Sequence, residues 1–171
     1  MPYTDLLRIT VFLTGAEATA LGAITAIAAG RDGDTNTVLV AAVWWLISLG
    51  LGLYLGRPAR AADGVRDALA LARTATALPE ETPARIAAVR LWPIGLTALV
   101  AGVLGVIFPG VAVIGAGYAL LVALAMRTRE AAVLGIEHRD GVKFYVVPNS
   151  ALRPVELVRT PGLRSDRLHA H

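Results

Sequence analysis

The sequence contains no cysteine, which excludes disulfide bonds, thiol catalysis and cysteine-ligated metals. Charge is scarce as well: 17% of the residues are charged, whereas a soluble domain usually has about a quarter. Lysine occurs only at Lys143, so every other basic residue, histidine aside, is an arginine. The charges are also unevenly spread, because long stretches lack them almost entirely. That distribution is typical of a membrane protein rather than of a soluble domain with a large core.

Apolar residues take the place of the missing charge. They make up 56% of the 171 residues, and the mean hydropathy is +0.61. A hydrocarbon layer of about 30 Å requires about 20 apolar residues in a helix. Four stretches meet or nearly meet this length and predict a membrane all-α fold, a four-transmembrane-helix bundle: residues 9–29, 38–55, 91–108 and 111–126.

Two features of these spans have alternative interpretations. Pro109-Gly110 separates the third span from the fourth and predicts a tight helical hairpin, because proline and glycine stop a helix and turn the chain. The alternative, one kinked helix of about 35 residues, is too long for a bilayer. The first span resembles a signal peptide with small residues near Ala28, but Glu17 interrupts its apolar run. We therefore expect the first span to be retained.

The placement of arginine predicts the orientation of the chain. Arginines are frequent between the second and third spans, and Arg127 and Arg129 follow the fourth. The loop at 31–37 has one arginine against two aspartates, and the turn between the third and fourth spans is uncharged. Because Lys and Arg favour the cytoplasmic side, we expect a bacterial inner-membrane protein with both termini in the cytoplasm. The same rule accounts for the high pI, so nucleic-acid binding is not expected.

The chain is expected to have five parts. Two transmembrane hairpins, at residues 1–56 and 91–127, are separated by a cytoplasmic connector at 57–90. A cytoplasmic β-hairpin or meander follows at 128–160, and the last part, 161–171, is a flexible basic tail.

The connector predicts a short amphipathic helix over residues 61–77, since apolar residues such as Val65 and Leu69 share one helical face. This helix lies either on the inner membrane surface or against the tail of the protein itself. Thr82 followed by Pro83 is typical of an N-cap with proline at the first helical position. A helix is therefore expected to run from there into the third span.

The tail changes to a period of two. Residues 132–138 and 142–147 flank Asp140-Gly141, the preferred two-residue hairpin turn, and predict two antiparallel strands. A third strand is expected at 154–158. So small a sheet is marginal alone, so it is expected to dock on the connector helix, the membrane or another protein. The candidate docking residues are Leu134, Ile136, Phe144, Tyr145 and Val147.

Glu17 is the leading candidate for a functional residue. It lies near the middle of the first span, and Thr10 and Thr14 precede it by seven and three residues on nearly the same helical face. Acids inside the membrane are costly and by default functional. The stripe is either a hydrogen-bonding contact to another helix, in this chain or in a partner, or a protonatable site in a transport path. A position facing lipid without a role is the third interpretation.

Small residues recur every four positions and predict close helix packing, inside the chain or with a partner subunit. These positions are Ala18, Gly22, Ala26, Gly52, Gly56, Gly115, Ala119 and Ala123. Trp44 and Trp45 lie too deep in the second span to be interfacial anchors, so we expect them to be packing groups.

The sequence contains no nucleophile–base set, phosphate-binding glycine loop or metal-ligand motif. No catalytic residue, cofactor or metal is therefore expected, and the protein is not expected to be an enzyme. The leading hypothesis is an accessory, scaffolding or assembly subunit of a larger membrane complex. Its expected partners are membrane lipids and either other membrane-protein subunits or copies of itself. The alternatives are a small oligomeric proton-coupled transporter that uses Glu17, and a sensor of anionic lipids at the membrane surface.

Overall fold

A computed structural model describes residues 1–33, 35–57, 65, 69–70, 72–74, 82–151 and 153–161. Four long helices dominate the described part: α1 (Tyr3–Asp32), α2 (Thr35–Leu55), α4 (Pro83–Ile107) and α5 (Pro109–Asp140). All four are long and apolar enough to cross a membrane. The prediction of four long apolar helices is confirmed, and the fold is consistent with a multi-pass membrane protein.

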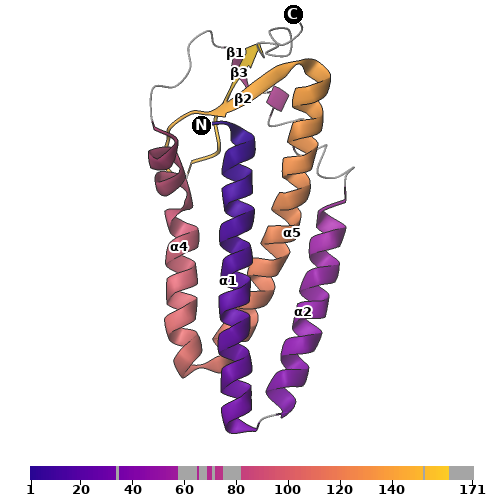
Figure 1. The fold of residues 1–171 in the computed structure, drawn as a ribbon, viewed down its shortest axis with the longest axis vertical. Helices are drawn as coiled ribbons and strands as arrows, with labels where there is room; N and C mark the ends of the chain where they lie inside the picture. Colours follow the sequence, from indigo (N-terminus) through magenta and orange to yellow (C-terminus); the bar gives the residue numbers. More distant parts are fainter. Residues whose placement is uncertain are drawn as a thin grey trace, which may run out of the picture.

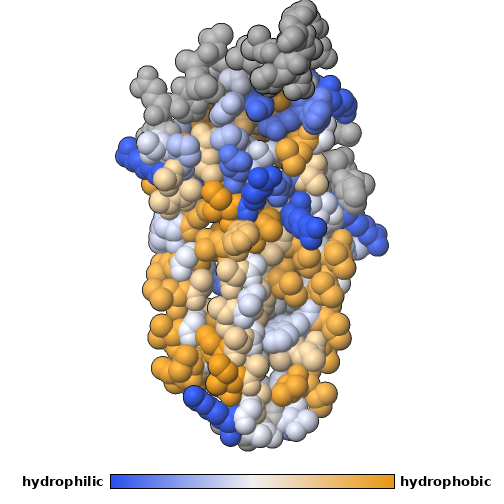
Figure 2. Space-filling model, in the orientation of Figure 1, coloured by the Kyte–Doolittle hydropathy of each residue, from blue (hydrophilic) through white to orange (hydrophobic). Residues whose placement is uncertain are grey.

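α5 is the central helix. It packs against α1, α2 and α4, whereas α2 has few contacts with α1, and in Figure 1 α5 crosses behind α1. The most apolar window of α5 is 33% buried, against 17% in each of the other three helices. Most apolar side chains of α1, α2 and α4 therefore face outward. Figure 2 shows them covering the helices, while hydrophilic side chains gather at the end that carries the small sheet.

The third and fourth spans are separate helices, as predicted. α4 begins at Pro83 after Thr82 and ends at Ile107, and Pro109 is the first residue of α5. Phe108 alone joins them: its N–H donates to the carbonyl of Leu104 (2.7 Å), and its own carbonyl accepts from the N–H of Val111 (2.9 Å). The proline therefore starts the second helix of the hairpin, where its missing N–H costs nothing.

The predicted strand at 132–138 is wrong, because α5 continues through it to Asp140. Gly141 ends the helix with a left-handed backbone (φ 62°), and its N–H donates to the carbonyl of Glu137. Glycine at a positive φ serves equally well in a hairpin turn and in a helix C-cap. The preceding Ala-, Leu- and Glu-containing segment favours a helix, and its deeply buried residue, Val133, packs at helical spacing with Ile136.

The sheet has three strands in the order β1-β3-β2. β2 (Val142–Val146) pairs antiparallel with β3 (Leu157–Pro161), and β1 (Arg73–Thr74) pairs parallel with β3. β2 is thus a strand as predicted, but its partner is β3 instead of residues 132–138. β3 also begins three residues later than the expected 154–158.

The connector helix predicted over 61–77 falls largely outside the described residues. Val65, Leu69 and Ala70 have helical backbone, but Arg73–Thr74 forms β1, so the helix does not extend to residue 77. The strand is favoured there because β3 offers backbone hydrogen bonds along its free edge. The tail after Pro161 also lies outside the described residues.

An apolar core lies at the sheet end of the molecule. This sheet-end cluster consists of Met1, Leu6, Leu7, Val65, Leu69, Ile86, Val133, Val142, Phe144, Val146 and Leu157. The N-terminus joins it, since the carbonyl of Met1 accepts from the N–H of Val146 (2.9 Å) and Pro2 forms a bridge with Tyr145. The apolar face of the sheet is therefore covered by the helices and connector of the protein itself.

Candidate functional site

Glu17 lies on the packing face of α1. Leu6 and Thr10 precede it at spacings of eleven and seven residues, and Ile24 follows it by seven, which places all four side chains along one line of the helix. Leu6 and Thr10 are buried, Ile24 is partly buried, and Glu17 is half-buried. Glu17 thus lies on the side of α1 that faces the other helices, with its side chain partly exposed.

Two apolar clusters lie on either side of Glu17 along the bundle axis. The sheet-end cluster contains Leu6 of the same line. The loop-end cluster consists of Leu21, Ala112 and Ala116, with Ile24, Trp45 and Ala101 packed against it. Both clusters combine residues of α1, α4 and α5, so the line that carries Glu17 faces α4 and α5. On α5, the buried residues between the two clusters are Gly117, Ala119 and Ala123.

The two threonines predicted to accompany Glu17 are buried beside it, but their hydroxyl protons are already used. Thr10 Oγ1 donates to the carbonyl of Leu6 and Thr14 Oγ1 to that of Thr10, both at 2.8 Å. Neither hydroxyl is therefore a donor to Glu17 in this conformation. Among the described residues, Glu17 has no hydrogen-bond or ion-pair partner. An acid within an apolar helix is expected to meet a partner or to carry a proton.

The predicted small residues differ in their surroundings. A Cβ at Gly52 would lie 3.0 Å from Leu124, one at Gly56 would lie 2.7 Å from Thr128, and one at Gly115 would lie 2.8 Å from Leu21. These three glycines therefore mark close helix contacts within the chain. Ala119 and Ala123 are buried in α5. On α1, Ala18 and Gly22 are partly exposed and Ala26 is exposed, so this seam is the least occupied of those predicted.

Two further contact positions, Gly117 and Ser48, were not predicted from the sequence. Gly117 faces the indole of Trp44, and a Cβ there would also lie 2.7 Å from the hydroxyl of Ser48. Ser48 is fully buried and precedes Gly52 by four residues, so the same small-residue spacing identifies it. Gly117 has no such signal, because its neighbours four residues away are Val113 and Leu121.

Trp44 and Trp45 attach α2 to α5. Trp44 Nε1 donates to the carbonyl of Ile114 (3.3 Å), and Trp45 Nε1 donates to that of Val113 (3.1 Å). Helix carbonyls have a second lone pair for such bonds, so each indole satisfies its N–H inside the apolar region. The expected packing role agrees with these contacts.

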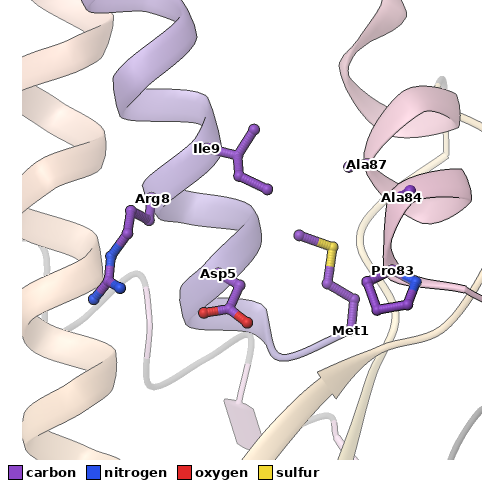
Figure 3. Close-up of a pocket in the computed structure, with 7 residues that line it drawn as sticks. All are labelled: Met1, Asp5, Arg8, Ile9, Pro83, Ala84 and Ala87. Atoms are coloured by element: carbon purple, nitrogen blue, oxygen red, sulfur yellow. The ribbon is translucent and has the colours of Figure 1, made fainter.

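A second feature is a cleft of about 260 Å³ between the first turns of α1 and α4 (Figure 3). It is lined by Met1, Asp5, Arg8, Ile9, Pro83, Ala84 and Ala87. Met1 and Ile9 point into the space between the helices, whereas Arg8 points away from α4 and pairs with Glu130 of α5 (Nε–Oε1 3.1 Å). The walls are mainly apolar and contain no nucleophile–base pair.

The predicted docking residues of the tail lie in different environments. Phe144 is 3% exposed within the sheet-end cluster, and Ile136 packs against that cluster, so neither is available to a partner. Tyr145 and Val147 are partly buried, and Leu134 is 42% exposed. Burial of Phe144 inside the protein removes the main reason for expecting a partner on this sheet.

Two polar side chains fix the ends of the sheet region. Glu137 Oε1 accepts from the N–H of Phe144 (3.0 Å), which ties the last turn of α5 to β2. Burial raises the pKa of the Glu137 carboxyl above its ordinary value and Asp5 adds to this, while the Phe144 N–H and Lys143 oppose it. On the other side, Arg90 of α4 donates to the carbonyls of Arg153 (2.8 Å) and Pro154 (3.2 Å).

Metal-ligating side chains do not gather in the described part of the chain, where no group of three His, Cys, Asp or Glu residues occurs. Glu17 and its surroundings therefore form the candidate site with the clearest chemical character. No known protein family matches this chain, and neither a curated protein nor a solved structure is significantly similar to it.

Proposed function

We propose that this protein is a non-catalytic, multi-pass subunit of a larger bacterial inner-membrane assembly, in an accessory, scaffolding or assembly role. The observation that carries the proposal is Glu17: a half-buried carboxyl in the middle of an apolar helix, without a partner in the described residues. Polar groups within membrane helices commonly hydrogen-bond across to another helix. A partner subunit is the source of that bond in this proposal.

The distribution of arginine supports an orientation with both termini in the cytoplasm. The sheet end of the described helices carries Arg57, Arg85, Arg90, Arg127 and Arg129. At the opposite end, Arg31 lies at the end of α1, and the α4–α5 turn is uncharged. The positive-inside rule assigns the sheet end to the cytoplasm, and the N-terminus lies at that same end (Figure 1).

The helix surfaces, rather than the sheet, are the proposed contact surface. The apolar face of the sheet is covered by the sheet-end cluster. α2 packs mainly on α5, and its other side has an apolar groove of about 350 Å³ lined by Leu39, Val40, Val43, Trp44 and Ile47. In a membrane, lipid or a neighbouring helix covers such a surface.

The test of this proposal is the native mass of the protein. Extraction from its own membrane in a mild detergent, followed by native mass spectrometry, is expected to recover it bound to at least one other membrane protein in a fixed ratio. Recovery of a strict monomer that retains no protein partner would overturn the proposal.

A small oligomeric proton-coupled transporter is the second candidate function. The observation that favours it is the layer of hydroxyl and small side chains around Glu17, between two apolar clusters. A protonatable group in such a layer is a common element of transport paths. In proteoliposomes, substrate movement coupled to a pH gradient should disappear in Glu17→Gln while the protein remains folded. Absence of Glu17-dependent proton or solute movement argues against transport.

A further inference from the structure

The partner of Glu17 must bring a donor or a positive charge. The hydroxyl protons of Thr10 and Thr14 are bonded to their own helix. The nearest described basic residue on α1 is Arg8, nine residues away or about 14 Å along the axis, and it is paired with Glu130. Nothing described within the bundle therefore compensates the carboxyl group.

The described buried residues of α4, Ile86 and Gly105, lie near its two ends. α4 and α5 meet closely near their turn, where a Cβ on Gly105 would lie 2.8 Å from Ala112, and they separate toward the sheet in Figure 1. α4 has no buried residue between Ile86 and Gly105. The residues between these two positions are partly buried or exposed, so α4 is less deeply packed in its middle than at its ends.

The surroundings suit a helix better than a small organic cation. An organic cation is usually held by aromatic faces. Phe12, Trp92 and Tyr118 are each more than half exposed, and Trp44 and Trp45 are bonded through their indoles to carbonyls of α5. The buried residues on α5 between the two apolar clusters are all small: Gly117, Ala119 and Ala123. Small side chains let a neighbouring backbone approach closely.

A second copy of this chain has no suitable charge. Lys, Arg and His are absent from residues 9–29, 38–55, 91–108 and 111–126. A second copy offers only neutral donors within these spans, such as the exposed Tyr118, so a cation has to come from a different protein. We infer that a transmembrane helix of a heterologous subunit, with one lysine or arginine near the middle of its span, packs beside α4 and α5 and pairs with Glu17. This inference rests on the proposed function and names the class of partner.

The experiment uses the full-length protein in neutral-lipid vesicles with designed peptides as probes. Each probe is a polyleucine transmembrane helix with a single central lysine, glutamine or leucine. The protein carries a fluorophore at Thr35→Cys, a position exposed at the loop end, and energy transfer reports association. The lysine peptide is expected to associate about tenfold more tightly than the leucine peptide, a ratio that corresponds to about 1.4 kcal/mol.

Three variants make the result specific. In Glu17→Gln, the association of the lysine peptide should fall to that of the leucine peptide. Asp5→Asn, which removes an exposed acid of the same helix near the sheet, should leave the preference unchanged. Glu17→Lys should transfer the preference to a peptide with a central glutamate. Equal association of the lysine and leucine peptides, or an unchanged preference in Glu17→Gln, overturns the inference.

Two further results separate this inference from the proposed function. If the native assembly persists in Glu17→Gln with unchanged composition, the named contact is wrong while the subunit role stands. If the native protein is a monomer, the subunit role itself fails. Energy transfer between differently labelled copies of this protein that depends on Glu17 would also overturn the assignment of a heterologous partner. The helix content and melting temperature of each variant should match those of the wild type.

Discussion

Gly117 of α5 lies against two side chains of α2, Trp44 and Ser48. A methyl group at this position would meet the indole of Trp44 and the hydroxyl of the fully buried Ser48. We expect Gly117→Ala to lower the free energy of unfolding by about 1–3 kcal/mol, the usual cost of overpacking. Denaturant titration in detergent micelles, followed by circular dichroism, measures this change.

The matched control is Gly102→Ala in α4, where nothing lies within 4 Å of the added methyl group. Alanine favours a helix over glycine by up to about 1 kcal/mol, so this variant should be as stable as the wild type or more stable. Equal stability of Gly117→Ala and Gly102→Ala would contradict the close approach of α2 to α5.

Glu137 is expected to make the stability of the protein depend on pH. Its pKa is raised chiefly by burial, so the folded protein holds this proton more tightly than the unfolded chain does. The stabilising contribution is therefore fully present below the ordinary carboxyl pKa and is lost as the pH rises through the raised value. Glu137→Gln keeps an acceptor for the N–H of Phe144 but has no carboxyl to titrate. The variant should therefore lose the part of the pH dependence of stability that comes from Glu137.

Thermal unfolding of the wild type and Glu137→Gln, measured from about pH 4 to pH 7, tests the sign. The stability of the wild type should fall relative to the variant as the pH rises. A wild type that gains stability relative to Glu137→Gln over this range would show that the Phe144 N–H and Lys143 outweigh burial.

The C-terminal part of α5 is a helix where the sequence predicted the first strand of a hairpin. Gly135 lies inside this helix with open space around it, and Gly141 ends it at φ 62°. Gly135→Ala should therefore stabilise the protein by up to about 1 kcal/mol, whereas Gly141→Ala should destabilise it by about 1 kcal/mol. Melting temperatures of the two variants provide the measurement. A destabilising Gly135→Ala would favour a strand at 132–138.

The elements that the sequence predicted well are those with strong local signals. The start of α4 follows from Thr82 and Pro83, and the hairpin between α4 and α5 follows from Pro109-Gly110. The segment 132–138 was ambiguous because its apolar residues fit both a period of two and helical spacing. In the helix, Val133 is fully buried in the sheet-end cluster, and such long-range packing leaves no local signal.

The candidate site was partly predictable for the same reason. A lone acid in an apolar span identifies Glu17 from the sequence alone. Its surroundings depend on which face of α1 packs against α4 and α5, and on the separation of those helices toward the sheet. Neither follows from residues near Glu17 in the chain, because both depend on contacts such as Gly115 with Leu21 and Gly105 with Ala112.

At the scale of the whole molecule, the two ends have different roles. α1 and α5 have 30 and 32 residues, which corresponds to about 45–48 Å and exceeds a hydrocarbon layer of about 30 Å. The excess lies at the sheet end, because the opposite ends of both helices lead directly into turns at Gly33 and Phe108. The sheet end is thus continuous with the prolonged helices, so a rigid-body motion of α1 or α5 would move the sheet as well.

The absence of cysteine makes the orientation of this molecule directly measurable. Single cysteines at Thr35→Cys and Phe108→Cys mark the two turns, and Val155→Cys marks the segment before β3; all three positions are exposed. With the sheet end in the cytoplasm, a membrane-impermeant maleimide should label the first two in intact cells and Val155→Cys only after permeabilisation. The reverse pattern would place the arginine-rich end outside, against the positive-inside rule. Labelling of only one of the two turns would contradict the four-span arrangement, because both turns must lie on the same side of a membrane that all four helices cross.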